Sequence, residues 1–458
     1  MYSQVKSGTL YGLTSEQVIV ETDLSPGLPA FNVVGLPDAT VRESKERIRA
    51  AIINSGFKFP SKRITINLAP AGTRKEGTHF DLPIAIGVMT SVGFIRKDRT
   101  SKFAFLGELS LDGSVNRING ALPLVIGLRS QGVERIILPI SNAEEASAID
   151  DVLIYPVRNL CEIVSYFDGE YEIPAYQKIQ NGQSKVIREE MDFIDVAGQE
   201  SVKRALQVAA AASHNVLMIG PPGSGKTMMA RRMSGIMPAM TYEEKLEVTK
   251  IYSIAGELSD HCPMITSRPF RSPHHTISGA ALVGGGSSPK PGEVSLAHYG
   301  VLFLDELPEF NRYVLEMLRQ PLEDERVSIS RIKGTTSFPS KFMLLASMNP
   351  CPCGYYGDNT HECTCSPNQI RNYLSKISGP LLDRIDMHIE ILPVKYSELA
   401  EMDPFYIDAP KPLPERNSEV MRLEVEAARQ IQLERYRNEE ISYNSQLTPG
   451  LMKKYCVL

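Results

Sequence analysis

The sequence predicts an α/β protein of at least two domains, the second of them built on a parallel sheet. With 458 residues, the chain is too long for one ordinary hydrophobic core. Its composition, 42% hydrophobic and 22% charged, is typical of a folded globular protein. From Asp195 onward, helical stretches alternate with short, fully apolar strands. That alternation indicates a parallel sheet covered by helices on both faces.

Charge and hydropathy exclude some classes of protein. A net charge of −5 argues against a protein whose whole surface is wrapped by nucleic acid. The same net charge is compatible with basic elements that bind nucleic acid inside a channel. The N-terminus, MYSQVKSGTL, has no apolar signal core, and no stretch approaches eighteen uninterrupted apolar residues. We therefore expect a cytoplasmic protein that does not enter a membrane.

Residues 1–174 are expected to form an α+β domain. Short β-rich runs occupy residues 17–22, 63–68, 103–106 and 135–138, and a helix-like stretch covers residues 39–55. Residues 175–191 have no apolar periodicity, so we place an interdomain linker there.

Residues 192–395 are expected to form the second domain. A helix is predicted at residues 200–212, apolar strands at 215–220, 300–305 and 341–348, and a hairpin at 328–338. The remainder, 396–458, contains a charged helical segment at 415–440. Its apolar residues recur in helical steps at Val420, Leu423, Ala427 and Ile431. We interpret this segment as the start of a helical lid that the chain does not complete.

A phosphate-binding loop follows the first apolar strand of the second domain. The sequence GPPGSGKT satisfies G-x-x-x-x-G-K-[ST] and lies between that strand and a helix. Backbone N–H groups of such a loop face phosphates, the lysine reaches the β- and γ-oxygens, and the threonine hydroxyl binds Mg²⁺. The sequence therefore predicts an ATP and Mg²⁺ site at Gly220, Pro221, Pro222, Gly223, Ser224, Gly225, Lys226 and Thr227.

Two carboxylates end the next apolar strand. Asp305 is predicted to ligate Mg²⁺ through water, and Glu306 to polarise the attacking water as a general base. An acidic strand end is also a common helix N-cap, and only its pairing with the phosphate loop favours the catalytic interpretation.

Two further polar residues have a functional and a structural interpretation. Asn349 ends the third apolar strand, where an amide suits a sensor of the γ-phosphate or of the attacking water, or serves as a turn residue before Pro350. Arg384 lies among apolar residues in SGPLLDRID. It is either an arginine finger acting on a neighbouring subunit's ATP or a member of a surface salt bridge.

These four elements, in this order, resemble AAA+ ATPases, and most closely the magnesium-chelatase and minichromosome-maintenance-like branch. RPFRSPHH at 268–275, the glycines at 284–286 and the hairpin at 328–338 resemble that branch's insert and pre-sensor hairpin. Residues 195–199 resemble the segment that lines the adenine pocket. The whole chain resembles the ComM/YifB family, which implies a homo-oligomeric ring, expected to be a hexamer, with ATP at subunit interfaces.

Residues 103–115 and 132–139 resemble the proteolytic domain of Lon, which uses a serine–lysine dyad. His79 stands where that pattern has the serine, and Leu122 where it has the lysine. Neither supplies a hydroxyl nucleophile with an amine base beside it. The resemblance therefore implies a Lon-like fold without protease activity.

Four cysteines cluster after the sensor strand as C-x-C, nine residues, C-x-C. Cys351, Cys353, Cys363 and Cys365 supply enough thiolates for a tetrahedral Zn²⁺ site. Reduced loop thiols and a redox role remain alternatives.

The resemblance to the ComM/YifB family implies a motor that remodels or translocates single-stranded or branched DNA, driving branch migration during homologous recombination in natural transformation. Arg331 and Lys333, beside Gly334 at the hairpin turn, are candidate DNA contacts, and ordinary solvated charges are the alternative. A second hypothesis is a magnesium-chelatase-like ATPase that remodels a partner protein. A Lon-like peptidase is disfavoured by His79 and Leu122.

Overall fold

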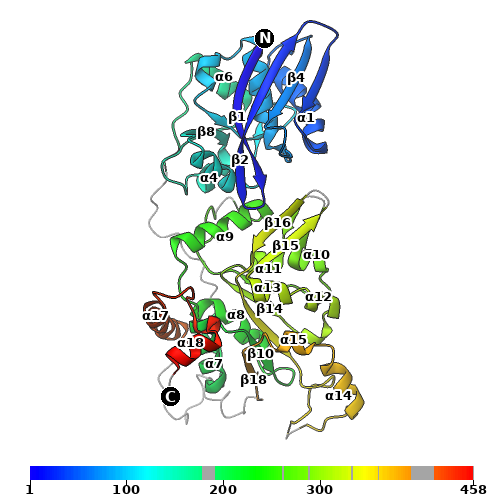
Figure 1. Ribbon diagram of the computed structural model, residues 1–458, viewed down its shortest axis with the longest axis vertical. Helices are drawn as coiled ribbons and strands as arrows, with labels where there is room; N and C mark the ends of the chain where they lie inside the picture. The colour runs from blue at the N-terminus through cyan, green and yellow to red at the C-terminus, as the bar shows by residue number, and fades with distance from the viewer. Residues whose placement is uncertain are drawn as a thin grey trace, which may run out of the picture. The chain divides into compact units, whose positions relative to one another are not determined.

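The computed structural model describes residues 1–177, 191–259, 262–286, 289–331, 334–358, 361–392 and 417–456. The chain divides into two compact units. The N-terminal unit comprises Met1–Gly182 and Thr249–Ile265, and the C-terminal unit comprises Gln183–Val248 and Thr266–Leu458 (Figure 1). No helix among the described residues is both long enough and apolar enough to cross a membrane.

The N-terminal unit is built on a seven-stranded mixed sheet in the order β3-β4-β2-β1-β5-β8-β9. The central strands β1, β2 and β4 run antiparallel to their neighbours in that group, and the other pairs are parallel. The strand bounds are β1 Tyr2–Tyr11, β2 Thr14–Ser25, β3 Ala30–Val34, β4 Arg63–Ala69, β5 Ala104–Phe105, β8 Arg135–Pro139 and β9 Leu153–Val157.

Helices pack on this sheet through apolar faces. The main ones are α1 Ala39–Asn54, α2 Asp81–Val92, α4 Ala121–Ser130 and α6 Leu160–Asp168. Helix α2 contacts both β1 and β2 and is buried along almost its whole length. The predicted strands and the helix at residues 39–55 are confirmed, and so is the α+β class of this part of the chain.

The C-terminal unit contains a five-stranded sheet in the order β11-β14-β17-β10-β18, and every pair in it is parallel. The bounds are β10 Val216–Ile219, β11 Phe270–Arg271, β14 Val301–Leu304, β17 Met343–Met348 and β18 Met387–Glu390. Because parallel strands end at one edge of a sheet, the loops after β10, β14 and β17 meet there. The predicted parallel sheet is confirmed.

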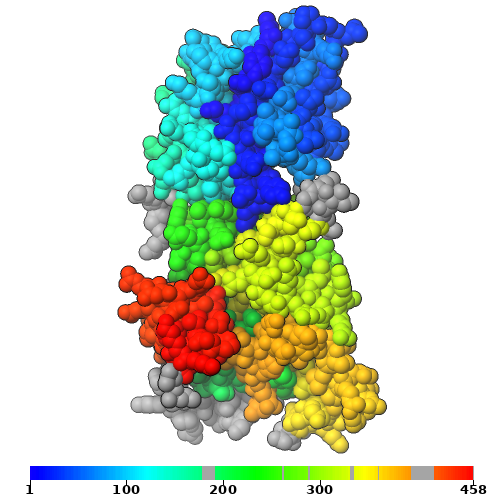
Figure 2. Space-filling model, in the orientation of Figure 1, coloured from blue at the N-terminus to red at the C-terminus, as the bar shows by residue number. Residues whose placement is uncertain are grey.

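Two helices flank the first of these strands. Helix α7 Glu200–Ala212 precedes β10, and α8 Lys226–Ile236 follows it. The predicted hairpin is present as β15 Arg326–Arg331 paired with β16 Gly334–Pro339. The last described helices are α17 Ser418–Arg435 and α18 Pro449–Tyr455, and Figure 2 shows this segment, in red, as a lobe on the surface of the unit.

The apolar residues that recur in helical steps are not the residues that the lid helix buries. Helix α17 contacts α7 and α8, but Val420, Leu423 and Ile431 are 41%, 59% and 58% exposed, and Ala427 is exposed as well. The buried side chains lie on another face of the helix. They are Ser418, Met421, Val425, Arg429 and Gln432.

Candidate functional site

The phosphate loop is shaped by glycines. Strand β10 ends at Ile219, the loop follows, and α8 begins at Lys226. Gly223 and Gly225 have φ of +78° and +83°, a left-handed conformation that other residues adopt at a cost. The loop therefore turns sharply into a helix N-terminus, where free backbone N–H groups favour an anion.

Lys226 lies over this loop. Its Nζ donates to the carbonyl oxygens of Gly220 and Pro221 at 2.8 Å each, and to Asn349 Oδ1 at 3.2 Å. Burial lowers the pKa of Lys226, and the carboxylates of Asp305 and Glu306 oppose that shift. The structure thus brings the lysine together with the proposed sensor amide, although they lie 123 positions apart in the sequence.

A pair of oxygen donors lies beside the loop. Thr227 Oγ1 donates to Asp305 Oδ2 at 2.6 Å. The other carboxylate oxygen, Asp305 Oδ1, accepts from the hydroxyl of Ser347 on β17. Hydroxyl and carboxylate oxygens are ligands that Mg²⁺ prefers. Sequence reasoning missed Ser347, and its signal is a hydroxyl within an otherwise apolar buried strand.

Glu306 has an unusual backbone conformation. Its φ of 53° is left-handed, which is uncommon for a residue other than glycine and often marks a functional site. Its side chain is exposed at a hollow of 560 Å³ that Asn349 also lines. The hollow is completed by Glu309, Pro352, Gln369, Asn372, Tyr373 and Lys376. A water molecule has room to approach the carboxylate there.

The remaining predicted site residues are not brought to the loop in the same way. Arg384 forms an ion pair with Glu323, and both side chains are partly exposed, as the salt-bridge alternative expects within one chain. Lys333 and the side chain of Arg331 lie outside the described residues. The backbone of Arg331 pairs with Gly334 in the hairpin.

The segment expected to line the adenine pocket is held from both ends. Asp195 accepts from Arg232 of α8 at 2.8 Å, and Gln199 donates to the carbonyl oxygen of Leu392 at 2.6 Å. Next to it, Asp192 accepts from the backbone N–H of Ser418 at 2.7 Å. The segment is thus joined to α8 and to Leu392, and Asp192, which precedes it, is joined to the first residue of α17.

The four clustered cysteines lie together. Their sulfur atoms are all within 4.8 Å of one another. Cys351 Sγ is 3.3 Å from Cys353 Sγ and 3.7 Å from Cys363 Sγ, and the backbone N–H of Cys353 donates to Cys365 Sγ at 3.3 Å. The spacing between the two C-x-C pairs therefore closes into one compact group.

The residues at the Lon-dyad positions are buried in the N-terminal unit. His79 Nε2 lies 2.9 Å from the carbonyl oxygen of Gly8, and burial lowers the pKa of the histidine to about 4. Leu122 is fully buried, and its backbone N–H donates to Glu145. Both residues have structural contacts in the core.

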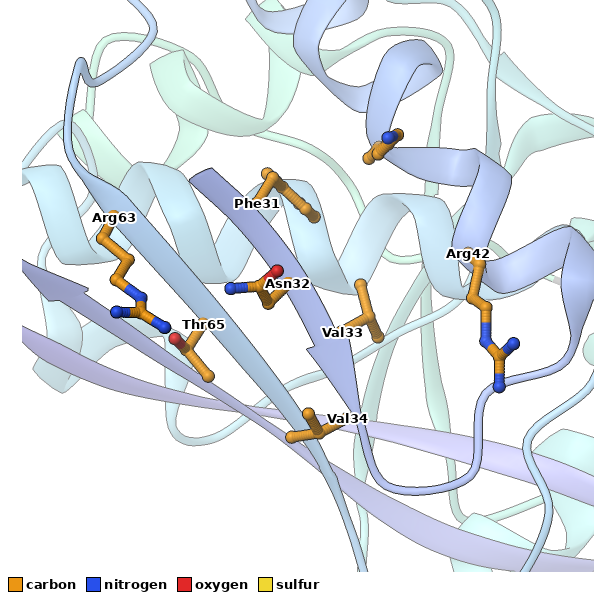
Figure 3. Close-up of a pocket in the computed structure, with 8 residues that line it drawn as sticks. Phe31, Asn32, Val33, Val34, Arg42, Arg63 and Thr65 are labelled. Carbon is orange, nitrogen blue, oxygen red and sulfur yellow. The ribbon is translucent and has the colours of Figure 1, made fainter. Parts of the chain in front are cut away.

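A hollow of 490 Å³ lies beside the edge strand β3 (Figure 3). Asn32 comes from β3, Arg63 and Thr65 come from the neighbouring β4, and Arg42 comes from α1. With Lys45, the two arginines make its lining basic. The residues predicted to bind ATP and DNA belong to the other unit.

Two family models match the chain. Residues 192–399 match magnesium chelatase, subunit ChlI, and residues 20–142 match subunit ChlI of Mg-chelatase. Two shorter similarities concern single parts of the chain. Lon protease 2 of Bacillus subtilis is 32% identical over 145 residues, covering 30% of this chain and 26% of that protein. The Holliday junction branch migration complex subunit RuvB of Prochlorococcus marinus is 26% identical over 259 residues, covering 52% and 59%.

Other similarities extend over most of the chain. Competence protein ComM of Haemophilus influenzae is 45% identical over 390 residues, which cover 84% of this chain and 76% of that protein. The protein YifB of Escherichia coli is 38% identical over 456 residues, which cover 100% and 86%. The chain therefore belongs to the magnesium-chelatase-like AAA+ family that includes ComM and YifB.

Proposed function

We propose that this protein is an ATP-hydrolysing ring motor that remodels or translocates DNA, driving branch migration during homologous recombination in natural transformation. The observation that carries the proposal is the convergence of Lys226, Thr227, Asp305 and Asn349 at one edge of the parallel sheet. Three separate strand ends supply these side chains. That arrangement suits a nucleoside triphosphate bound at the C-terminal ends of the strands.

Each residue has a distinct role in the proposed chemistry. The phosphate loop and Lys226 bind the β- and γ-phosphates, and Thr227 and Asp305 hold Mg²⁺, which offsets the negative charge of the phosphates. Glu306 orients and polarises the attacking water, and Asn349 senses the γ-phosphate. Arg384 reaches the ATP of a neighbouring subunit in the ring, which we propose to be a hexamer.

We also propose that Zn²⁺ occupies the cysteine cluster. A tetrahedral thiolate site with Zn–S bonds of about 2.3 Å has sulfur atoms about 3.8 Å apart. The distances of 3.3 and 3.7 Å from Cys351 Sγ to its two neighbours are close to that value. Four thiols within 4.8 Å of one another, together with these two distances, support Zn²⁺ in the cluster.

DNA as the substrate is supported by relatives and by the hairpin. The relative from Haemophilus influenzae is named a competence protein, and the partial relative RuvB is named for branch migration at Holliday junctions. The hairpin sequence brings Arg331 and Lys333 close to one turn, where cations would contact phosphates without reading bases. We propose that these two residues bind DNA in the ring pore.

A second candidate is a magnesium-chelatase-like ATPase that remodels a partner protein. The matches to both magnesium-chelatase family models favour it. In this case ATP hydrolysis would not respond to DNA. We propose no peptidase role, since His79 and Leu122 are both buried.

One assay separates the candidates. ATP turnover by the purified protein is measured alone and with single-stranded, duplex and branched DNA. The DNA motor predicts stimulation by DNA, and Arg331→Ala/Lys333→Ala predicts an unchanged basal rate with the stimulation lost. An identical rate in all four conditions favours the protein-remodelling candidate.

A further inference from the structure

The cysteine loop contacts the phosphate loop directly. Gly354 follows Cys353 and has φ of +90°. A Cβ atom on Gly354 would lie 2.5 Å from Pro222 Cδ and 3.2 Å from its Cγ. Real side chains do not tolerate an approach of 2.5 Å, so the backbone of the cysteine loop lies against the proline ring of the phosphate loop.

The same loop continues directly from the proposed sensor strand. Cys351 is two positions after Asn349 and is fully buried. Asn349 Oδ1 accepts from Lys226 Nζ at 3.2 Å, and the backbone N–H of Gly220 donates to the carbonyl oxygen of Met348 at 3.2 Å. The phosphate loop is therefore joined to the residues that lead into the cysteine cluster.

The cysteine loop has little regular structure of its own. Between the end of β17 at Met348 and the start of α14 Pro367–Leu374, the described residues form turns and bends without a helix or strand. Such a segment keeps one shape through its few fixed contacts, because turns contribute little packing of their own. Among the described residues of this segment, the four thiols form a group that a single metal ion can join.

We propose that Zn²⁺ at Cys351, Cys353, Cys363 and Cys365 braces the phosphate loop through Gly354 and Pro222, so that ATP affinity depends on zinc. The brace rests on the proposed ATP site and adds a second metal requirement to it, distinct from Mg²⁺. Loss of zinc frees the segment after Asn349 and removes the support behind Pro222. The metal acts here on the shape of the phosphate loop and takes no part in hydrolysis.

Two glycines of this loop provide a matched pair of variants. Gly354 and Gly357 both have left-handed φ, +90° and +83°, so alanine strains the backbone similarly at each. A Cβ at position 354 meets Pro222, whereas a Cβ at position 357 meets no atom within 4 Å. Only Gly354→Ala therefore disturbs the contact with the phosphate loop.

The experiment measures the affinity of the full chain for a fluorescent ATP analogue in Mg²⁺, together with zinc content. We expect about one zinc per chain in the wild type and in both variants. We expect Gly354→Ala to bind the nucleotide at least tenfold more weakly, and Gly357→Ala to stay within about twofold of the wild type. Equal affinity of the two variants would overturn the brace.

A second arm removes the metal. Wild-type protein is stripped with a zinc chelator under reducing conditions, and Mg²⁺ is then restored with or without added zinc. We expect a loss of nucleotide affinity similar to that of Gly354→Ala, and its recovery only when zinc is present. Full affinity in stripped protein, or absence of zinc from the wild type, would overturn the inference and leave the ATP site standing. Failure of zinc-loaded wild type to bind nucleotide would instead overturn the proposed function.

Discussion

Asp305 is fixed by two hydroxyl groups from different parts of the chain. Thr227 donates to one carboxylate oxygen at 2.6 Å, and Ser347 donates to the other. Two such hydrogen bonds hold the carboxylate in one orientation, which a metal ligand needs. Glu306, the next residue, has a left-handed backbone conformation and lines the hollow. The proposed metal ligand, Asp305, and the proposed base, Glu306, therefore have different surroundings.

The first prediction separates nucleotide binding from hydrolysis. Lys226→Ala should bind ATP about tenfold to a hundredfold more weakly, since a hydrogen bond to a charged group contributes about 1.5–3 kcal/mol. Glu306→Gln should bind ATP normally but hydrolyse it about 10² to 10⁴ times more slowly, because the water lacks its base. Equilibrium binding and single-turnover hydrolysis measure the two effects. Normal turnover by Glu306→Gln would remove this residue from the catalytic role.

A second prediction concerns His79 and pH. Burial lowers the pKa of His79 from 6.5 to about 4, so the unfolded chain takes up a proton at a pH where the folded unit does not. Stability that is present above pH 6.5 is therefore lost as the pH falls toward 4. The full effect is about 3 kcal/mol, from about 1.4 kcal/mol per pH unit.

His79→Gln is the control, because glutamine can still donate to Gly8 but cannot titrate. The raised pKa of Asp81, about 6 through burial, acts in the opposite direction in the same range, and comparing the two proteins cancels it. Hydrogen exchange of α2 amides at several pH values reports the stability. Parallel pH curves for the two proteins would contradict a buried, neutral His79.

Single site residues could be predicted where they belong to a motif that is contiguous in the sequence. The loop that ends in Lys226 and Thr227 is contiguous, and Asp305 is the first acidic residue after an apolar strand. Ser347 could not be found in this way. In the sequence, a serine within a buried strand carries no sign of a functional role. The role becomes evident only in the structure, where Asp305, which follows the neighbouring strand, accepts a hydrogen bond from the serine hydroxyl.

At the scale of elements, α17 shows why an apolar periodicity is not enough. Val420, Leu423, Ala427 and Ile431 fit a helical stripe, yet the helix buries the face that carries Arg429 and Gln432. Both polar side chains find partners there. Arg429 donates to the carbonyl oxygen of Ala210 at 3.2 Å, and Gln432 donates to that of Ala211 at 2.9 Å. These backbone acceptors come from α7 and cannot be read from the sequence of α17 alone.

The third prediction uses the two faces of this helix. Met421→Ala should destabilise the packing of α17 by about 2–5 kcal/mol, because it removes a fully buried side chain. Leu423→Ala removes a side chain that is 59% exposed and should cost less than about 0.5 kcal/mol. Hydrogen exchange of the α17 amides measures the difference. A larger effect at position 423 would show that the exposed stripe is covered in solution.

In the N-terminal sheet, the apolar pattern likewise fails to identify one strand. The central strand β1 was not among the predicted strands, whereas β2, β4 and β8 were. Its inward-facing positions include Ser3 and Ser7, which are fully buried. Ser3 Oγ donates to the carbonyl oxygen of Gly87 in α2 at 2.8 Å. Small polar residues at core positions conceal the alternation by which a strand is recognised.

In the whole molecule, the proposed role of Arg384 requires subunits to cooperate. Within one chain Arg384 pairs with Glu323, so the proposed role in a neighbour's site requires that pair to open in the ring. An exposed ion pair contributes little stability, typically about 0–1 kcal/mol. Opening it is therefore compatible with assembly.

The fourth prediction tests action between subunits. Arg384→Ala should reduce hydrolysis about 10³ to 10⁵ times while leaving ATP binding nearly intact. Mixing Arg384→Ala subunits with Lys226→Ala subunits should restore some activity, because a mixed interface can pair an intact phosphate loop with an intact arginine. Rings shown to contain both variants but with no recovered activity would contradict an arginine that acts between subunits.

In the proposed function, ATP hydrolysis by this chain moves DNA strands. The most direct measurement follows the branch point of a synthetic branched DNA, with ATP and Mg²⁺, in the presence of wild type or of Glu306→Gln. We expect ATP-dependent migration by the wild type, and DNA binding without migration by Glu306→Gln. Vigorous ATP hydrolysis by a wild type that leaves the branch point where it began would contradict the proposed function.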